Sequence, residues 1–435
     1  MSLLTVAIAL AACSGGGGAT PGLAFANPPT TNAKSQPLVT PTPVTRSTAR
    51  PNNNHGPQDA TPTPTPAPSS VPTQSPTQVP TQSPTQAPTP QPTPSFGRPE
   101  PAYNPDPFTV RLNGNEPLDP NSTQEINAMY AVDGHFWMSE LQIHAPGDTL
   151  GLDGASFSLA YSSDLDPAFT LHCTLYSGCP EEGQVVHIPG GLEPPDGWSR
   201  GGEAHVVVIN WMEAREDGLY HLNQIVPMHG GSLNIGYGGP CYFTSYQNGG
   251  VCNDAATAGE IPVGPLLLRA DELVAATAVG GDLGHALYIT TCVGNGQPEW
   301  PAVGGNGNGS PQCPPMGARI VLRKSDAQIA ALNVPEWDRV ILRTLAHYGM
   351  IADDNNNNTV WTFGPEDDNG RTSLGLQPAW PAAIALIAQT AQQYNIDMSI
   401  SNGSYHIALP YDTLQQSDMA VLAPPQANLR FRRKR

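Results

Sequence analysis

The amino-acid sequence predicts a mainly β protein: an antiparallel β-sandwich, jelly-roll-like, with two or three peripheral helices near the C-terminus. Short runs of branched and aromatic residues separated by Gly, Asn, Asp and Pro begin near residue 108. Several of these runs alternate apolar and polar residues, as half-buried strands do. Helical spacing of apolar residues is clear in only two segments, both after residue 330. Many strands with few helices favour packed sheets.

The first twelve residues predict export. Residues 3–10 are apolar, and this run is too short to cross a bilayer. Two alanines then precede Cys13, as small residues do at a cleavage point. The segment resembles the lipobox of bacterial lipoproteins, whose cysteine receives the lipid, although no Lys or Arg precedes the apolar run. We therefore expect a signal peptide at 1–12 and a protein anchored to the cell membrane by the lipid on Cys13, facing the extracellular side. An ordinary secretory signal is the alternative.

A proline-rich linker is expected to follow the lipidated cysteine, over residues 13–105. Residues 61–105 contain 15 prolines, and the heptapeptide at 72–78 recurs at 80–86. Such a segment has too few apolar side chains to bury a core, so it stays extended and disordered. The remaining residues, 106–435, are long enough for a large extracellular β-rich domain, with a small α+β appendage at 325–435 as a further option.

The charge of this domain limits its partners. The first 105 residues hold four basic and two acidic side chains, which leaves 15 basic and 35 acidic ones and a net charge of −20 for the rest. An acidic surface repels phosphate backbones, so no nucleic-acid partner is expected.

Six cysteines remain besides Cys13, and an exported protein can keep them as disulfides. Sequence alone allows fifteen pairings. Because sequential pairs would close short loops rich in Gly, Ser and Asn, we expect Cys173–Cys179, Cys241–Cys252 and Cys292–Cys313. No Cys-x-x-Cys pattern points to a metal-thiolate site.

The clearest strand signal is a hairpin. Residues 203–213 and 219–226 alternate, and Asp217-Gly218 between them is typical of a tight turn. Further strands are expected at 108–112, 286–293, 318–323, 359–363 and 404–409.

Two helices are expected near the C-terminus. Residues 333–336 resemble a capping box, apolar residues then recur at helical spacing to Tyr348, and Gly349 can end the helix. Pro381 opens the second helix, whose apolar face includes Ile384 and Ile387.

Five segments together resemble an uncharacterised family of secreted bacterial β-rich proteins. They are Ala-His-Val-Val-Val at 204–208, Gly-His-Ala-Leu-Tyr-Ile-Thr at 284–290, Trp-Pro-Ala at 300–302, Pro-Pro-Met-Gly-Ala-Arg-Ile-Val-Leu-Arg at 314–323 and Tyr-Gly-Met-Ile-Ala-Asp-Asp at 348–354. In the family, Trp-Pro-Ala is usually followed by Arg-His, whereas Val303 and Gly304 stand there in this chain. The resemblance implies an extracellular β-rich domain and no particular reaction.

The candidate site rests on two histidines. His205 and His285 each begin an apolar strand, within the two segments that best match the family. If those strands are neighbours, their imidazoles converge at one sheet end, where Glu260 or Asp282 could act as the supporting acid. The competing interpretation is that each histidine satisfies a local hydrogen bond in the core.

Other chemistries are weaker in the sequence. Carboxylate pairs such as a glycosidase needs could come from Glu213 and Glu216 or from Asp271 and Glu272, but the second pair is more simply a helix start. Asp164, Asp166 and residues 353–355 offer oxygen ligands for calcium, although a solvated turn is the simpler interpretation. No metal site and no cofactor are predicted. Exposed tryptophans could stack on sugars, the candidates being Trp198, Trp211, Trp300, Trp361 and Trp380.

Two functions remain open from the sequence. The first is a lipid-anchored surface protein whose domain binds polysaccharide or cell-wall polymer. The second is an extracellular glycan hydrolase that uses a His/carboxylate site. The absence of Gly-x-Ser-x-Gly, His-Glu-x-x-His and phosphate-loop motifs favours the first.

Overall fold

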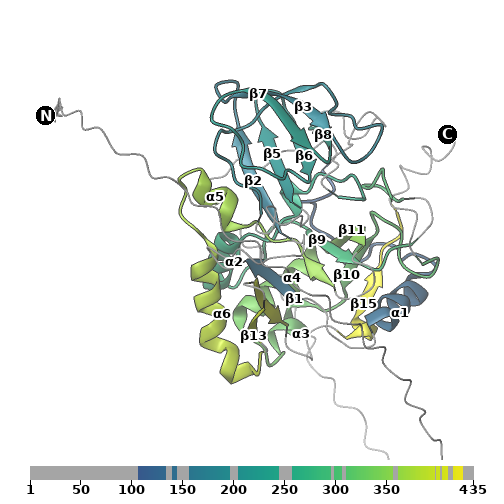
Figure 1. The fold of residues 1–435 in the computed structure, drawn as a ribbon. Helices are drawn as coiled ribbons and strands as arrows, with labels where there is room; N and C mark the ends of the chain where they lie inside the picture. The colour runs from purple at the N-terminus through teal and green to yellow at the C-terminus, as the bar shows by residue number, and fades with distance from the viewer. Residues whose placement is uncertain are drawn as a thin grey trace, which may run out of the picture. The chain divides into compact units, whose positions relative to one another are not determined.

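A computed structural model describes residues 106–133, 140–144, 156–195, 204–243, 257–294, 298–305, 310–355, 361–396, 398–401, 404–409 and 415–424. The signal peptide and linker expected at 1–105 lie outside these residues. The described part is mainly β, with four sheets and several helices (Figure 1). None of its helices is long and apolar enough to cross a membrane.

Two of the sheets share one core. The first has the order β2-β5-β6-β8, and the second the order β4-β3-β7. Buried side chains of both, such as Val206, Val208, Phe169 and Leu171, form a single hydrophobic cluster. The strands are β2 (Phe157–Ser162), β3 (Ala168–Cys173), β4 (Val185–His187), β5 (His205–Asn210), β6 (Arg215–Tyr220), β7 (Gly231–Ile235) and β8 (Tyr237–Tyr242).

The expected hairpin exists, but its turn lies earlier in the chain. Asn210 pairs with Arg215, so residues 211–214 make the turn, and Ala214 takes a positive φ of 52° there. Asp217 and Gly218 lie inside β6, which is buried on both faces. The turn is not at Asp217-Gly218 because the Asp217 carboxylate accepts a hydrogen bond of 3.0 Å from Arg215 Nε within the buried strand.

The third sheet is mixed and lies in the larger core. Its order is β12-β9-β11-β10-β15. The strands are β9 (Leu287–Thr291), β10 (Arg319–Leu322), β11 (Met350–Asn355), β12 (Thr362–Phe363) and β15 (Met419–Val421). The fourth sheet has the order β1-β14-β13, from β1 (Glu140–His144), β13 (Met398–Ser401) and β14 (Ser404–Ala408). Strands expected at 286–293, 318–323 and 404–409 are thus confirmed; residues 359–360 of the strand expected at 359–363 lie outside the described residues.

Six α-helices accompany these sheets within the described residues. They are α1 (Ser122–Asp133), α2 (Ala270–Val279), α3 (Asp326–Ala330), α4 (Glu336–His347), α5 (Asp368–Ser373) and α6 (Trp380–Tyr394), with short 3-10 turns η2 (Gly264–Leu266) and η3 (Gln416–Asp418). The two C-terminal helices expected from spacing are confirmed as α4 and α6. However, α4 is not peripheral: Trp337, Val340 and Ile341 are fully buried.

The details of helix ends differ from expectation. The capping box expected at 333–336 does not form, because Pro335 stands at the N-cap without a side-chain bond and Glu336 instead binds Arg339 and Arg343. A capping box does form at α3, between Ser325 and Gln328.

Two further expectations are corrected. Residues 108–112 form no strand, because Phe108 is buried in the core and its backbone N–H donates to the Asp106 carboxylate. The sheets are not all antiparallel, since β2 pairs with β5, β3 with β7 and β9 with β11 in parallel. Parallel neighbours need long crossover connections, and the chain between β9 and β11 supplies one that contains α4.

Two of the expected disulfides are confirmed, Cys173–Cys179 and Cys292–Cys313. Cys241 is also disulfide-bonded, and its expected partner, Cys252, lies outside the described residues.

Candidate functional site

A row of rings crosses the first sheet, and His205 is part of it. The strand registers place Phe157 opposite His205, His205 opposite Tyr220, and Tyr220 opposite Tyr237. The His205 ring lies 5.1 Å from the Phe157 ring and 5.2 Å from the Tyr220 ring, by centroid. Because residues paired across strands share a face, these four rings form one continuous line from the core outward. His205 is buried within it.

The outer end of this row meets a third tyrosine. Tyr176 comes from the loop between β3 and β4, and its ring lies 6.3 Å from Tyr220 and 6.0 Å from Tyr237. Its plane is within 24° of that of Tyr220 and at 74° to that of Tyr237. Tyr176 is 59% exposed. We call Tyr176, Tyr220 and Tyr237 the tyrosine platform.

The loop that carries Tyr176 is fixed at several points. The Cys173–Cys179 disulfide closes it, with Cα atoms 6.3 Å apart. The backbone N–H of Leu175 donates to the Gly236 carbonyl at 3.0 Å. The hydroxyl of Tyr237 donates to the Gly178 carbonyl at 3.5 Å. Tyr176 is therefore held next to Tyr220 and Tyr237, although it does not belong to a strand.

A buried acid group anchors the base of the same loop. Glu181 is fully buried, and its backbone N–H donates to the Gly238 carbonyl. Burial raises the pKa of the Glu181 carboxyl, while nearby Arg215 opposes this shift. Burial likewise holds the pKa of Asp217 well above its usual range, although Arg215 pairs with it at 3.0 Å. These groups lie between the two sheets, beneath the platform loop.

Polar residues rim the platform. The His221 ring lies 4.1 Å from that of Tyr220. Burial raises the pKa of Tyr237, and the negative charge of Glu260 raises it further. His221 and Glu260 both adopt a φ of 53°, which is uncommon for residues other than glycine.

His285 has different neighbours. Its Nε2 lies 3.1 Å from Glu272 Oε2, and its Nδ1 lies 2.7 Å from the carbonyl oxygen of Ala286. Glu272 also pairs with Arg269 at 3.1 Å. Burial alone would raise the pKa of Glu272, but Arg269 and His285 together lower it to about 2. All three side chains are buried, so this is a core ion network.

The four residues of the sequence-based site are thus spread over three surroundings. His205 packs against Tyr220 of the platform, the charge of Glu260 acts on Tyr237, and His285 lies in the Glu272 network. Asp282 binds Arg111 at 3.0 Å and His347 at 2.7 Å. The acid that contacts His285 is Glu272, which the sequence offered as half of a carboxylate pair with Asp271 or, more simply, as a helix start. A shared site for His205 and His285 stays a prediction.

Sequence reasoning missed the platform itself. It named tryptophans as the aromatic candidates, yet Trp361 and Trp380 are buried, Trp211 and Trp300 are half-buried, and Trp198 lies outside the described residues. The sequence pattern that could have identified the platform is Tyr176 between the closely spaced Cys173 and Cys179. A short loop closed by a disulfide has little room to bury an aromatic side chain, so the ring stays largely exposed.

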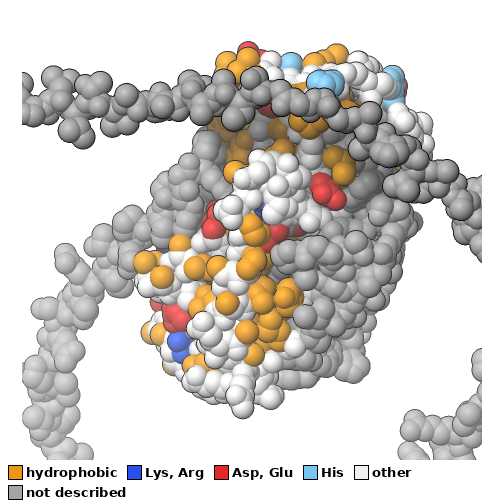
Figure 2. All heavy atoms as spheres, turned by 60° about the vertical axis from the view of Figure 1, so that its left-hand side comes forward, with side chains coloured by type: hydrophobic (Ala, Val, Ile, Leu, Met, Phe, Trp, Pro, Cys, Tyr) orange, Lys and Arg blue, Asp and Glu red, His pale blue; other side chains and the backbone are white. Residues whose placement is uncertain are grey.

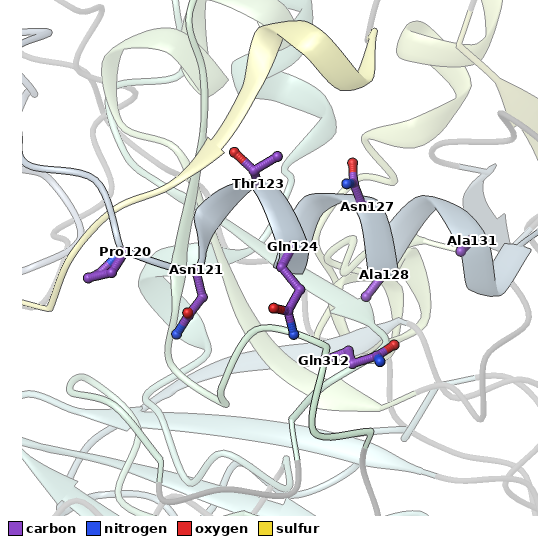
Figure 3. Close-up of a pocket in the computed structure, with 8 residues that line it drawn as sticks. All are labelled: Pro120, Asn121, Thr123, Gln124, Asn127, Ala128, Ala131 and Gln312. Carbon is purple, nitrogen blue, oxygen red and sulfur yellow. The ribbon is translucent and has the colours of Figure 1, made fainter.

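A concave surface lies beside α1. Figure 3 shows Gln124 of this helix, and Asn121 just before it, pointing toward the side where Gln312 lies. The pocket has a volume of 520 Å³. None of its described lining residues is charged.

The described residues offer little for a metal ion. No group of three or more His, Cys, Asp or Glu side chains among them is arranged to hold one. Asp353, which the sequence offered for calcium, is fully buried and accepts a hydrogen bond from the Thr257 hydroxyl at 2.8 Å. Burial raises its pKa well above the usual range, and a protonated carboxyl is a poor calcium ligand. Asp166 accepts hydrogen bonds from Ser163 instead.

No family model, curated protein or solved structure matches this chain. The function must therefore be inferred from the site.

Proposed function

We propose that the protein is a lipid-anchored cell-surface protein whose β-rich domain binds polysaccharide at the tyrosine platform. The observation that carries this proposal is the exposed ring of Tyr176 in contact with Tyr220 and Tyr237. Contiguous apolar surface, rather than a single exposed side chain, marks binding sites, and the three adjoining tyrosine rings form such a group. Tyrosine suits sugars because its ring offers an apolar face to the C–H groups of a sugar and its hydroxyl stays wet.

The polar side chain beside the platform and the net charge of the domain restrict the class of ligand. His221, whose ring lies beside that of Tyr220, can exchange hydrogen bonds with sugar hydroxyls. The domain carries a net charge of −20, and Figure 2 shows few Lys or Arg side chains on the face it presents. Like charges would repel uronate or phosphate polymers, so a neutral polymer is favoured.

The support for a lipid anchor lies in the amino-acid sequence. A lipid on Cys13 and an extended linker up to residue 105 would hold the domain away from the membrane, where it can reach a wall or extracellular polymer. Changing Cys13 to Ser should release the protein from membranes. If the C13S protein stays as firmly bound as the wild type, the lipid anchor is wrong.

The arrangement of the two sheets that carry the platform can be described more specifically. We propose that β2-β5-β6-β8 and β4-β3-β7 pack face to face as a small β-sandwich. Their shared hydrophobic cluster supports this, because sandwich cores are built from the inner faces of two sheets.

The experiment is retention on insoluble amylose, cellulose and chitin. The Y176A variant should bind the preferred polymer roughly tenfold more weakly, because an exposed anchor ring is lost without disturbing the core. L165A is the matched control, since Leu165 is 92% exposed and belongs to another loop. Equal retention of Y176A and wild type would remove the platform as the site, and no retention of wild type on any polymer would end the proposal.

A glycan hydrolase remains the second candidate, because the charge of Glu260 acts on Tyr237 and His221 packs against Tyr220. Measuring the release of reducing ends on the same polymers separates the two functions. Release by wild type that disappears in E260Q, with retention preserved, would make the protein an enzyme.

A further inference from the structure

We propose that the groove between α1 and the loop at Gln312 is a second binding site for a neutral polysaccharide. This inference shares its ligand class with the proposed function, and therefore rests on it, but it depends on different residues. The groove belongs to α1 and to the loop that the Cys292–Cys313 disulfide closes, whereas the platform belongs to β6, β8 and the Cys173–Cys179 loop.

The lining of the groove is rich in side-chain amides. Asn121, Gln124, Asn127 and Gln312 all contribute to it. Each amide has two N–H donors and a carbonyl acceptor, and none carries a charge; the Asn127 carbonyl already accepts a hydrogen bond from Gln416, so Asn127 offers a sugar its N–H groups. A sugar hydroxyl both donates and accepts, so it matches this lining. In a domain with 20 excess negative charges, a concave surface without a charged lining residue is suited to an uncharged ligand.

The size and floor of the groove also fit a sugar chain. Its volume of 520 Å³ lies in the range of small-molecule sites. Ala128 and Ala131 form part of the surface, and their small side chains let a polymer lie close to the helix.

The groove is preorganised because α1 is held firmly. Ile126 and Met129 on its inner side are buried in the main core, and the Tyr130 ring lies 5.3 Å from that of Trp361. The Ser122 hydroxyl accepts a hydrogen bond of 2.8 Å from the backbone of Val421. On the outer side, the Asn127 amide oxygen accepts a hydrogen bond from Gln416 of η3. A ligand therefore meets amides whose backbone is already fixed, which lowers the entropy cost of binding.

Two sites on one domain would act together on a long chain. Once the first site is occupied, the second binds at a high effective concentration, and retention on a polymer exceeds the affinity of either site. A short oligosaccharide cannot occupy both sites at once, so it reports each site separately.

The test is isothermal titration calorimetry of the full-length protein with maltohexaose, cellohexaose and chitohexaose. Wild type should bind two equivalents of the preferred hexasaccharide. The Q124A/Q312A variant should bind one, Y176A should bind one, and the triple variant should bind none. Retention of Q124A/Q312A on the matching insoluble polymer should fall roughly tenfold. Q392A/Q393A is the matched control, because both glutamines are exposed on α6, and it should keep two equivalents.

Each result decides between the proposals. One equivalent in wild type that Q124A/Q312A leaves unchanged would overturn the groove and leave the platform intact. One equivalent that Y176A leaves unchanged and Q124A/Q312A abolishes would keep the groove and overturn the platform. No binding in wild type, to any hexasaccharide or polymer, would overturn both.

Discussion

The imidazole of His205 stands directly opposite Tyr220 across β5 and β6, with ring centroids 5.2 Å apart. His205 is buried against the core, while Tyr220 is half-buried at the surface. The histidine therefore supports the inner side of a ring whose outer side contacts Tyr176. This relationship links core packing to the platform and makes His205 a positioning residue.

Replacing His205 should test that role. H205A removes a buried ring that contacts Phe157 and Tyr220, and should lower the free energy of unfolding by about 2–4 kcal/mol. It should also weaken polymer retention, because Tyr220 loses its support. Urea unfolding measures the first effect and retention of the folded fraction the second. H229A, at an exposed histidine, is the control and should change neither. Unchanged stability of H205A would exclude the packing role.

The Cys173–Cys179 disulfide should matter to binding as well as stability. A loop this short contributes roughly 2–3 kcal/mol in the chain-entropy model. The C173S/C179S variant should stay folded and lose polymer affinity, because Tyr176 is no longer held over Tyr220 and Tyr237. C292S/C313S removes the disulfide of a different loop, so it should lose stability while short-oligosaccharide binding at the platform is retained. Equal affinities of C173S/C179S and wild type would show that Tyr176 needs no covalent support.

Glu272 should stabilise the fold at neutral pH, and this stabilisation should be lost in acid. Its folded-state pKa of about 2 lies below the ordinary value of 4.5. The unfolded state therefore binds more protons between these values, so the free energy of unfolding falls as pH drops from 4.5 toward 2. E272Q should cost roughly 3 kcal/mol at pH 7, since it leaves His285 without its buried partner and Arg269 with Glu366 as its remaining buried acid. Thermal unfolding across this pH range, with D271N as the half-exposed control, measures it. A D271N effect as large as that of E272Q would contradict the network.

Glu125 should have the opposite pH dependence. Burial, together with Asp119 and Glu299, raises its pKa from 4.5 to about 7. The folded state then binds more protons, so the free energy of unfolding falls as pH rises from 4.5 to 7, by an amount on the order of 3 kcal/mol. E125Q should flatten this part of the stability curve, and urea unfolding at several pH values checks it. An E125Q curve parallel to that of wild type would assign the effect elsewhere.

Local pattern determined much of the fold. The alternation around His205 predicted β5, and the spacing of Trp337 and Ile341 predicted α4, because both periods are properties of neighbouring residues. Sequential cysteine pairing was confirmed for two short loops. Strand direction could not be predicted in this way: whether β2 runs parallel to β5 depends on how distant connections cross the sheet.

The candidate site was decided by tertiary structure. Tyr176, Tyr220 and Tyr237 are separated by other strands in the sequence and meet only through the β6–β8 register and a disulfide-closed loop. Glu272 was recognisable as a helix start, and its contact with His285 required α2 to lie beside the residues that precede β9. By itself the sequence determined periodicity, composition and the expected anchor, which depend on adjacent residues. Which polar and aromatic groups lie together was decided only in the folded chain. Those contacts join residues that are far apart in the sequence, and they depend on which side chains are buried and on the register between strands.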